Sequence, residues 1–160
     1  MRVRSQVVDV MSRRVVGIAP DASLSRAAAL MHAHGVHHLP VLANDGELVG
    51  IVTQSDLLAA TVSALEPREV AESRDSQLKA HTNVEEIMTP DPVTVRSKAP
   101  LKDAVRALTR NGRLRCLPVV DDRRNVVGMV TDWDLLRVLE EFLDDSPYFD
   151  PAPSFTEPSL

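Results

Sequence analysis

Apolar and polar positions along the first half of the chain follow a pattern that predicts five elements. Apolar residues recur at i, i+3, i+4 and i+7 over residues 24–31, which is the apolar stripe of a helix. Two runs rich in β-branched residues follow at 36–42 and 48–53, and the letters ANDG between them predict a hairpin turn. A short apolar pair, Val15-Val16, precedes the helix, and a second helix is expected from Ser55. The predicted order is strand, helix, strand, strand, helix.

The second half of the chain repeats the first. A shift of 77 positions aligns 7–35 with 84–112, and Arg113 raises the shift to 78, which aligns 50–58 (GIVTQSDLL) with 128–136 (GMVTDWDLL). Of 54 aligned pairs, 17 are identical, and they fall mainly at turns, strand ends and apolar positions. This distribution indicates two copies of one structural unit.

The size of the repeats favours a shared domain. Each repeat has about 60 residues, too few to bury much apolar surface alone, so we expect an α+β fold in which two βαββα repeats pack about a pseudo-two-fold axis. The expected boundaries are 7–65 for the first repeat, 66–83 for a linker, 84–143 for the second repeat and 144–160 for an acidic, proline-rich tail. Because 44% of the residues are hydrophobic but only 3% aromatic, the core must be mainly aliphatic.

Charge and composition limit the kinds of partner and the cellular location that can be expected. The net charge of −5 arises at the end of the chain, where six acidic and no basic residues follow position 139. The preceding residues carry 18 basic and 17 acidic side chains, so no surface for nucleic acid is predicted. No apolar run approaches the ~20 residues of a membrane span, and the N-terminus lacks the apolar stretch of a secretion signal. A single cysteine cannot form an intrachain disulfide, so a cytoplasmic protein is predicted.

Each repeat has a threonine at the end of its last strand and an aspartate three residues later. These pairs are Thr53 with Asp56 and Thr131 with Asp134. The spacing is that of a capping box, in which two side chains close the first turn of a helix. A cap does not explain the glycine three residues before each threonine. A nucleoside cleft would, because a carboxylate can accept hydrogen bonds from both vicinal hydroxyls of a ribose. Both interpretations stay open here.

The repeated strings and their surroundings resemble a known family. The segments GVHHLPVLANDGELVGIVTQSDLL and LRCLPVVDDRRNVVGMVTDWDLL, with the openings DVMS and EIMT, closely resemble tandem CBS (cystathionine β-synthase) domains over residues 7–143. The resemblance implies a CBS pair, or Bateman module, with two pseudo-symmetric clefts that commonly hold AMP, ADP, ATP, S-adenosylmethionine or a related compound such as NAD. The implied protein is a non-enzymatic sensor that requires no cofactor, binds an adenosine ligand as its regulator, forms a homodimer and signals through an unidentified effector protein.

The resemblance also assigns residues to the two clefts. For the cleft whose ribose ligands would be Thr53 and Asp56, it implies Thr94, Ala99, Leu114, Cys116 and Pro118 around the base, and His37 and His38 at the phosphates. For the cleft of Thr131 and Asp134, it implies Ala22, Val36, His38 and Pro40 around the base, and Arg115 at the phosphates. Gly17 aligns with Thr94, so the cleft of Thr131 and Asp134 lacks a side-chain hydroxyl for the base. The cleft of Thr53 and Asp56 is therefore expected to favour base recognition, and the cleft of Thr131 and Asp134 is expected to favour phosphate attraction.

Other residues favour ordinary structural roles or a different function. Four histidines within 32–38 suggest Zn²⁺ or Ni²⁺, but a helix end and two faces of a strand would not gather them. Cys116 is expected to be a small buried residue, and Trp133 a packing or dimer-contact residue. The sequence has no recognisable catalytic arrangement. The alternative function is a ligand-free scaffold for interaction and dimerisation, with vestigial clefts and Thr-x-x-Asp strings that only cap helices.

Overall fold

The computed structural model describes residues 5–65, 83–110, 112 and 114–144. The elements of the first half of the chain are η1 (Val7–Asp9), α1 (Leu24–His34), β1 (His38–Leu42), β2 (Leu48–Thr53) and α2 (Gln54–Leu65). Those of the second half are α3 (Val84–Ile87), β3 (Thr89–Pro90), β4 (Val95–Arg96), α4 (Leu101–Arg110), β5 (Cys116–Val120), β6 (Val126–Thr131) and α5 (Asp132–Asp144). The predicted linker and tail lie outside the described residues, except for Asn83 and Asp144.

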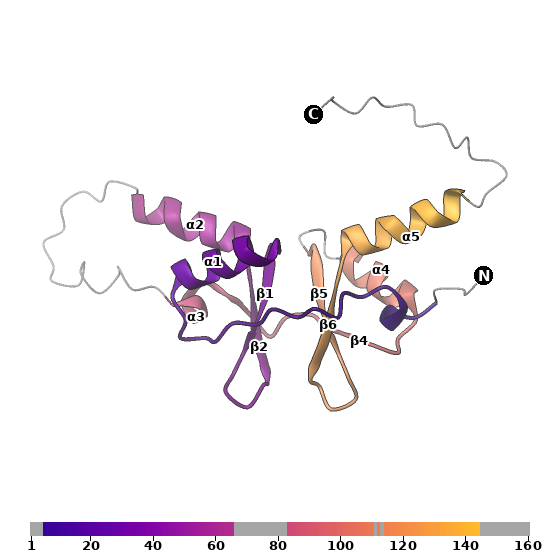
Figure 1. The fold of residues 1–160 in the computed structure, drawn as a ribbon, viewed down its shortest axis with the longest axis horizontal. Coiled ribbons are helices and arrows are strands. Elements are labelled where there is room, and N and C mark those ends of the chain that lie inside the picture. The colour runs from indigo at the N-terminus through magenta and orange to yellow at the C-terminus, as the bar shows by residue number, and fades with distance from the viewer. Residues whose placement is uncertain (1–4, 66–82, 111, 113, 145–160) are drawn as a thin grey trace, which may run out of the picture.

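Two three-stranded sheets form the centre of the molecule, and the helices gather toward one side of them (Figure 1). Their strand orders are β1-β2-β3 and β4-β5-β6. The hairpins β1–β2 and β5–β6 have equivalent registers, since Pro40 pairs with Ile51 and Pro118 with Met129. The two halves lie side by side about an approximate two-fold axis, with both hairpin turns at the same end (Figure 1). The predicted α+β fold of two packed repeats is confirmed.

The first strand of the first repeat lies later in the chain than predicted. Residues 15–16 are in no strand, and Ile18 instead forms a single parallel bridge with Val41. In the second repeat β4 begins at Val95. The reason is that Ser12 pairs with Met129 of the other half, so the residues between it and Ile18 must cross from one half to the other.

The opening segment of each repeat packs on the core of the other repeat. The N–H of Val7 donates to the carbonyl of Ala99 at 3.0 Å, and the N–H of Val84 donates to the carbonyl of Ala22 at 2.9 Å. Val7 and Val84 are both fully buried, each in the core of the half that it joins. In Figure 1 the indigo segment with η1 accordingly lies beside α4, and α3 lies beside α1. The two repeats therefore exchange segments, and each depends on the other to complete its core.

This exchange explains the glycine of each repeated string. A Cβ atom on Gly128 would lie 2.6 Å from Sδ of Met11 and 2.8 Å from the carbonyl oxygen of Ser12. A Cβ atom on Gly50 would collide in the same way with the side chain of Met88. These glycines have a packing reason that neither interpretation of the string included, because they are needed where the exchanged methionine crosses the strand.

The hydrophobic interior has three parts. One cluster fills each half, and both are built from aliphatic residues, as the composition predicts. A third, much smaller cluster joins the two sheets and contains the buried residues Ile51, Cys116 and Met129. The contact between the sheets is therefore small relative to the two cores.

Candidate functional site

The repeated Thr-x-x-Asp strings form two capping boxes of nearly identical geometry. At the start of α2, the N–H and the hydroxyl of Thr53 both donate to Oδ2 of Asp56 at 2.7 Å, and the N–H of Asp56 donates back to Oγ1 of Thr53 at 3.2 Å. Thr131 and Asp134 repeat these contacts at 2.8, 2.8 and 3.3 Å at the start of α5. The predicted capping boxes are thus present. Both use Oδ2 only, so Oδ1 of each aspartate receives no hydrogen bond from a described residue.

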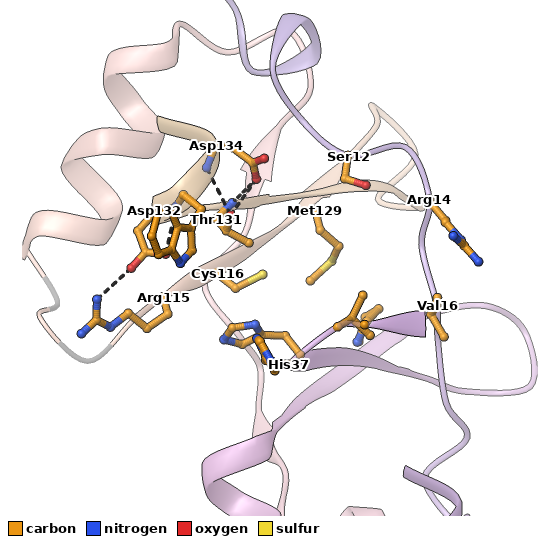
Figure 2. Close-up of a pocket in the computed structure, with 15 residues that line it drawn as sticks. Ser12, Arg14, Val16, His37, Arg115, Cys116, Met129, Thr131, Asp132 and Asp134 are labelled. Atoms are coloured by element: carbon orange, nitrogen blue, oxygen red, sulfur yellow. Dashed lines mark hydrogen bonds and ion pairs between the residues drawn. The ribbon is translucent and has the colours of Figure 1, made fainter. Parts of the chain in front are cut away.

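A cavity of about 520 Å³ opens beside Thr131 and Asp134 (Figure 2). We call it the Asp134 cleft, and residues of both repeats line it. From the first repeat these are Ser12, Arg14, Val16, Gly35, Val36, His37, His38 and Pro40. From the second they are Arg115, Cys116, Met129, Thr131, Asp132, Trp133 and Asp134. Its size lies within the range of small-molecule sites, ~300–1,000 Å³.

A second cavity of about 560 Å³ lies at the equivalent place beside Thr53 and Asp56. We call it the Asp56 cleft, and it also draws residues from both repeats. They are His38, Ile51, Thr53, Ser55, Asp56, Thr89, Asp91, Pro92, Val93, Leu114, Arg115 and Cys116. The alignment of the repeats also relates the two clefts, since the shift of 77 places Val16 on Val93 and the shift of 78 places Asp56 on Asp134.

Most of the predicted ligand residues line the cleft assigned to them. Thr53, Asp56, His38, Leu114 and Cys116 line the Asp56 cleft, and Thr131, Asp134, Val36, His38, Pro40 and Arg115 line the Asp134 cleft. His37, which the resemblance placed in the Asp56 cleft, lines the Asp134 cleft instead. The strand-end residues were placed well because the hairpin registers are local and equivalent.

Four predicted ligand residues do not line the predicted cleft. The carbonyl of Ala22 accepts a hydrogen bond from the first residue of α3, and the carbonyl of Ala99 accepts one from the first residue of η1. Pro118 is fully buried within β5. Thr94 lines a polar hollow between the two hairpin turns, together with Arg123 and Arg124. A role for these four in binding would require a different arrangement of the cleft walls.

Sequence reasoning missed the residues that the exchanged segments bring to the clefts. Ser12, Arg14 and Val16 line the Asp134 cleft, and residues 89 and 91–93 line the Asp56 cleft. These two stretches align with each other in the repeat, and this alignment was the one sequence signal that they have equivalent roles. The pattern of residues did not show that both stretches cross from one half of the molecule to the other.

The charged groups of the Asp134 cleft are partly paired. The guanidinium of Arg115 forms an ion pair with Oδ2 of Asp132 at 2.8 Å, and these side chains point toward one another in Figure 2. Arg14 lies at 3.0 Å from Nδ1 of His34 through its Nη2. No described carboxylate forms an ion pair with Arg14.

Two groups between the clefts have shifted pKa values. His38 and Cys116 align in the repeat, and each lines both clefts. Burial lowers the pKa of His38, and the neighbouring His37 lowers it further, against the opposing effect of Asp132 and Asp56. Burial raises the pKa of the Cys116 thiol to about 12, with Asp134 and Asp132 adding to the rise. At neutral pH the centre of the molecule therefore holds a neutral imidazole and an unreactive thiol.

Neither a metal cluster nor a membrane helix is found in the described part of the chain. No three His, Cys, Asp or Glu residues there come close enough to hold a metal ion. None of the described helices combines the length and the apolar character that crossing a bilayer requires.

Comparison with known proteins identifies relatives of the whole fold. The sequence profile of the CBS domain matches residues 7–63 and 84–141. A CBS domain-containing protein of Dictyostelium discoideum is 38% identical over 88% of this chain and 95% of its own length. A homoserine O-acetyltransferase of Methanohalobium evestigatum is 35% identical over 85% of this chain, but this chain spans only 24% of that enzyme.

Two solved structures match the fold and contain ligands. The CBS domain pair of protein MJ0100, in complex with 5′-methylthioadenosine and S-adenosyl-L-methionine, has a TM-score of 0.71 and 28% identity, covering 86% of this chain and 97% of its own. CBSX2, a CBS-pair protein of Arabidopsis thaliana, has in its complex with AMP a TM-score of 0.70 and 31% identity, with the same coverage of 86% and 97%.

Proposed function

This chain belongs to the CBS domain family, with two copies of the domain, and from that premise we propose that it is a regulatory module for an adenosine-containing ligand. The ligand would occupy the clefts between the two repeats. Its class is that of AMP, ADP, ATP, S-adenosylmethionine or NAD, and no other cofactor is required. The role is one of binding and signalling and not of catalysis, and we place it in the cytoplasm, in keeping with a single buried cysteine.

The observation that carries the proposal is the position of Asp56 and Asp134. Oδ2 of each carboxylate accepts the hydrogen bonds of its own helix cap, whereas Oδ1 receives no hydrogen bond from a described residue. Each aspartate also borders a cavity. Capping and ribose binding are therefore compatible uses of the same carboxylate. The ligands of the related structures, AMP in one and two adenosine compounds in the other, support the same class of ligand here.

The arrangement of the cores suggests how a ligand would regulate. Each cleft is walled by both repeats, whereas the cluster that joins the sheets is small. A ligand that contacts both repeats adds contacts across this joint and favours the relative orientation in which both walls fit it. We propose that an effector protein reads this orientation.

A homodimer is the second part of the proposal. Helices α2 and α5 lie on the same side of the molecule (Figure 1) and expose apolar side chains, which include the equivalent residues Leu58 and Leu136 and also Phe142. Burial of these side chains against a second copy would remove them from water. Sedimentation equilibrium should find a dimer for the wild type and a monomer for Leu136→Glu. Val105→Glu, at an exposed apolar residue of α4, should remain dimeric.

Ligand binding is tested by calorimetry and by thermal unfolding with AMP, ADP, ATP, NAD, S-adenosylmethionine and 5′-methylthioadenosine. At a hundred times its dissociation constant, a ligand should stabilise the fold by about 2.7 kcal/mol. Asp56→Ala together with Asp134→Ala should abolish this gain. Asp9→Ala is the matched control, because Asp9 caps η1 through the N–H of Gln6 at 3.0 Å and lines neither cleft.

The capping boxes also support a second candidate, the ligand-free scaffold. If the Thr-x-x-Asp strings serve only as caps, the aspartate variants should lose ~0.5–2 kcal/mol of stability, as Asp9→Ala should, with no ligand response to lose. The absence of binding by all six compounds at millimolar concentration would favour this candidate over the regulatory module.

A further inference from the structure

The two clefts are equivalent in the repeat but differ in charge at one pair of positions. A shift of 77 residues places Asp91 on Arg14, and each of these residues lines its own cleft. The exchange of a cation for an anion changes the local charge by two units. Arg115 borders both clefts, whereas Asp132, with which it is paired, lines the Asp134 cleft alone. Apart from the histidines, the lining side chains therefore sum to no net charge in the Asp134 cleft and to −1 in the Asp56 cleft.

In the Asp134 cleft this difference leaves a cation available to a ligand. Arg14 contacts His34 and forms no ion pair with a described carboxylate. Together with Asp134 it gives the cleft both a ribose ligand and a positive group for a phosphate. In the Asp56 cleft the corresponding pair is Asp56 with Asp91, two carboxylates. Asp91 takes part in none of the ion pairs of the described residues, although it also lines the polar hollow that contains Arg123 and Arg124. A phosphate in the Asp56 cleft would meet two carboxylates with Arg115 as the one arginine in the lining, whereas in the Asp134 cleft two arginines balance two carboxylates. A neutral or cationic adenosine compound would not be repelled from the Asp56 cleft.

We propose that the two clefts sort adenosine compounds by charge: the Asp134 cleft takes adenosine phosphates through Arg14, and the Asp56 cleft takes adenosine compounds without a phosphate because of Asp91. This proposal rests on the proposed function and names the ligand class of each cleft. The chain would thereby compare a phosphorylated and an unphosphorylated adenosine compound in one molecule.

A second difference between the clefts provides a reporter for each. Trp133, the only tryptophan of the chain, lines the Asp134 cleft, and Ser55 occupies the equivalent position beside the Asp56 cleft. Indole fluorescence, excited at the red edge where adenine absorbs little, should therefore respond to a ligand in the Asp134 cleft only. In the double variant Trp133→Phe and Ser55→Trp, the reporter moves to the Asp56 cleft.

The probes are AMP and 5′-methylthioadenosine, titrated by calorimetry and by fluorescence. In the wild type AMP should change the fluorescence of Trp133 and 5′-methylthioadenosine should not, whereas the double variant should respond to 5′-methylthioadenosine. Arg14→Gln should weaken AMP binding about ten-fold and leave 5′-methylthioadenosine within about two-fold. The matched control is Arg13→Gln, since Arg13 is exposed, adjacent in the chain and lines neither cleft.

Asp91→Asn tests the other cleft without backbone strain. Asp91 has a φ of 45°, a left-handed conformation that asparagine also tolerates. The variant should admit AMP to the Asp56 cleft, so that calorimetry finds about two AMP molecules per chain where the wild type binds about one.

The outcomes separate this proposal from the proposed function. If both probes bind but Arg14→Gln behaves like Arg13→Gln, or if both probes act on the same tryptophan reporter, charge sorting is wrong and the regulatory module stands. If neither probe binds the wild type at millimolar concentration, charge sorting is overturned. The regulatory module is overturned as well only if ADP, ATP, NAD and S-adenosylmethionine also fail to bind.

Discussion

Substitution of Gly128 by alanine should destabilise the whole molecule and distort one cleft. The new Cβ atom would meet Sδ of Met11 at 2.6 Å and the carbonyl oxygen of Ser12 at 2.8 Å. A methionine side chain can move, but the Ser12 carbonyl accepts from the N–H of Met129 at 2.9 Å, and the N–H of Ser12 donates to the carbonyl of Met129 at 2.9 Å. Relief of the clash therefore requires this antiparallel bridge to open or shift.

The magnitude follows from two terms. Overpacking of a core position costs ~1–3 kcal/mol, and weakening of two backbone hydrogen bonds adds ~0.5–1.5 kcal/mol for each that is lost. We expect a loss of about 2–4 kcal/mol in the free energy of unfolding, which is a large part of the ~5–15 kcal/mol of a typical domain. Ser12 and Met129 both line the Asp134 cleft, so ligand binding there should weaken while the Asp56 cleft is spared.

Urea denaturation followed by circular dichroism measures the change. Gly112→Ala is the control, because nothing lies within 4 Å of a Cβ atom built on Gly112, and it should alter stability by less than about 1 kcal/mol. Gly128→Ala should cost less stability in a Met11→Ala background than in the wild type, because the side chain that the new Cβ atom meets is then absent. Equal stability of Gly128→Ala and Gly112→Ala would refute the assignment of these glycines to the exchanged segments.

Three further results are expected. Because the pKa of His38 is lowered from 6.5 by burial and by His37, the unfolded chain binds its proton more readily. The contribution of His38 to the free energy of unfolding should therefore be fully present above pH 6.5 and be lost as the pH falls below that value. The free energy of unfolding should depend less on pH in His38→Gln than in His32→Gln, the control at an exposed site. The same pH dependence in both variants would contradict a lowered pKa for His38. With its pKa raised from 9.0 to about 12, Cys116 should be labelled by a thiol reagent at neutral pH roughly 1,000-fold more slowly in the folded than in the urea-unfolded protein, and equal rates would disprove the burial argument. Ser23→Ala should cost ~1 kcal/mol, because Oγ of Ser23 accepts from the N–H of Arg26 at 3.2 Å and caps α1; Ser25→Ala, at an exposed residue of the same helix, should not, and equal losses would argue against a cap.

Local signals in the sequence were sufficient for the repeat and for most of the elements. The apolar stripe at 24–31 became α1, and Gly35 ends that helix in the left-handed conformation with a φ of 62°. The predicted hairpins formed because a short turn between β-rich runs determines its own register. The Thr-x-x-Asp strings formed capping boxes, which involve only residues three apart. These features depend on neighbours in the chain, so the pattern of residues contains them.

What only the tertiary structure decided depends on contacts between distant segments. Because η1 and α3 are exchanged between the repeats, Gly50 packs against Met88 and Gly128 packs against Met11. The exchange also makes the carbonyls of Ala22 and Ala99 acceptors for the exchanged segments. The same exchange brought Arg14 and Asp91 to the clefts. No local pattern records which of two similar cores a crossing segment joins, because an apolar segment satisfies the same periodicity in either place. That choice is made by the packing of the two repeats together, and the charges of the clefts follow from it.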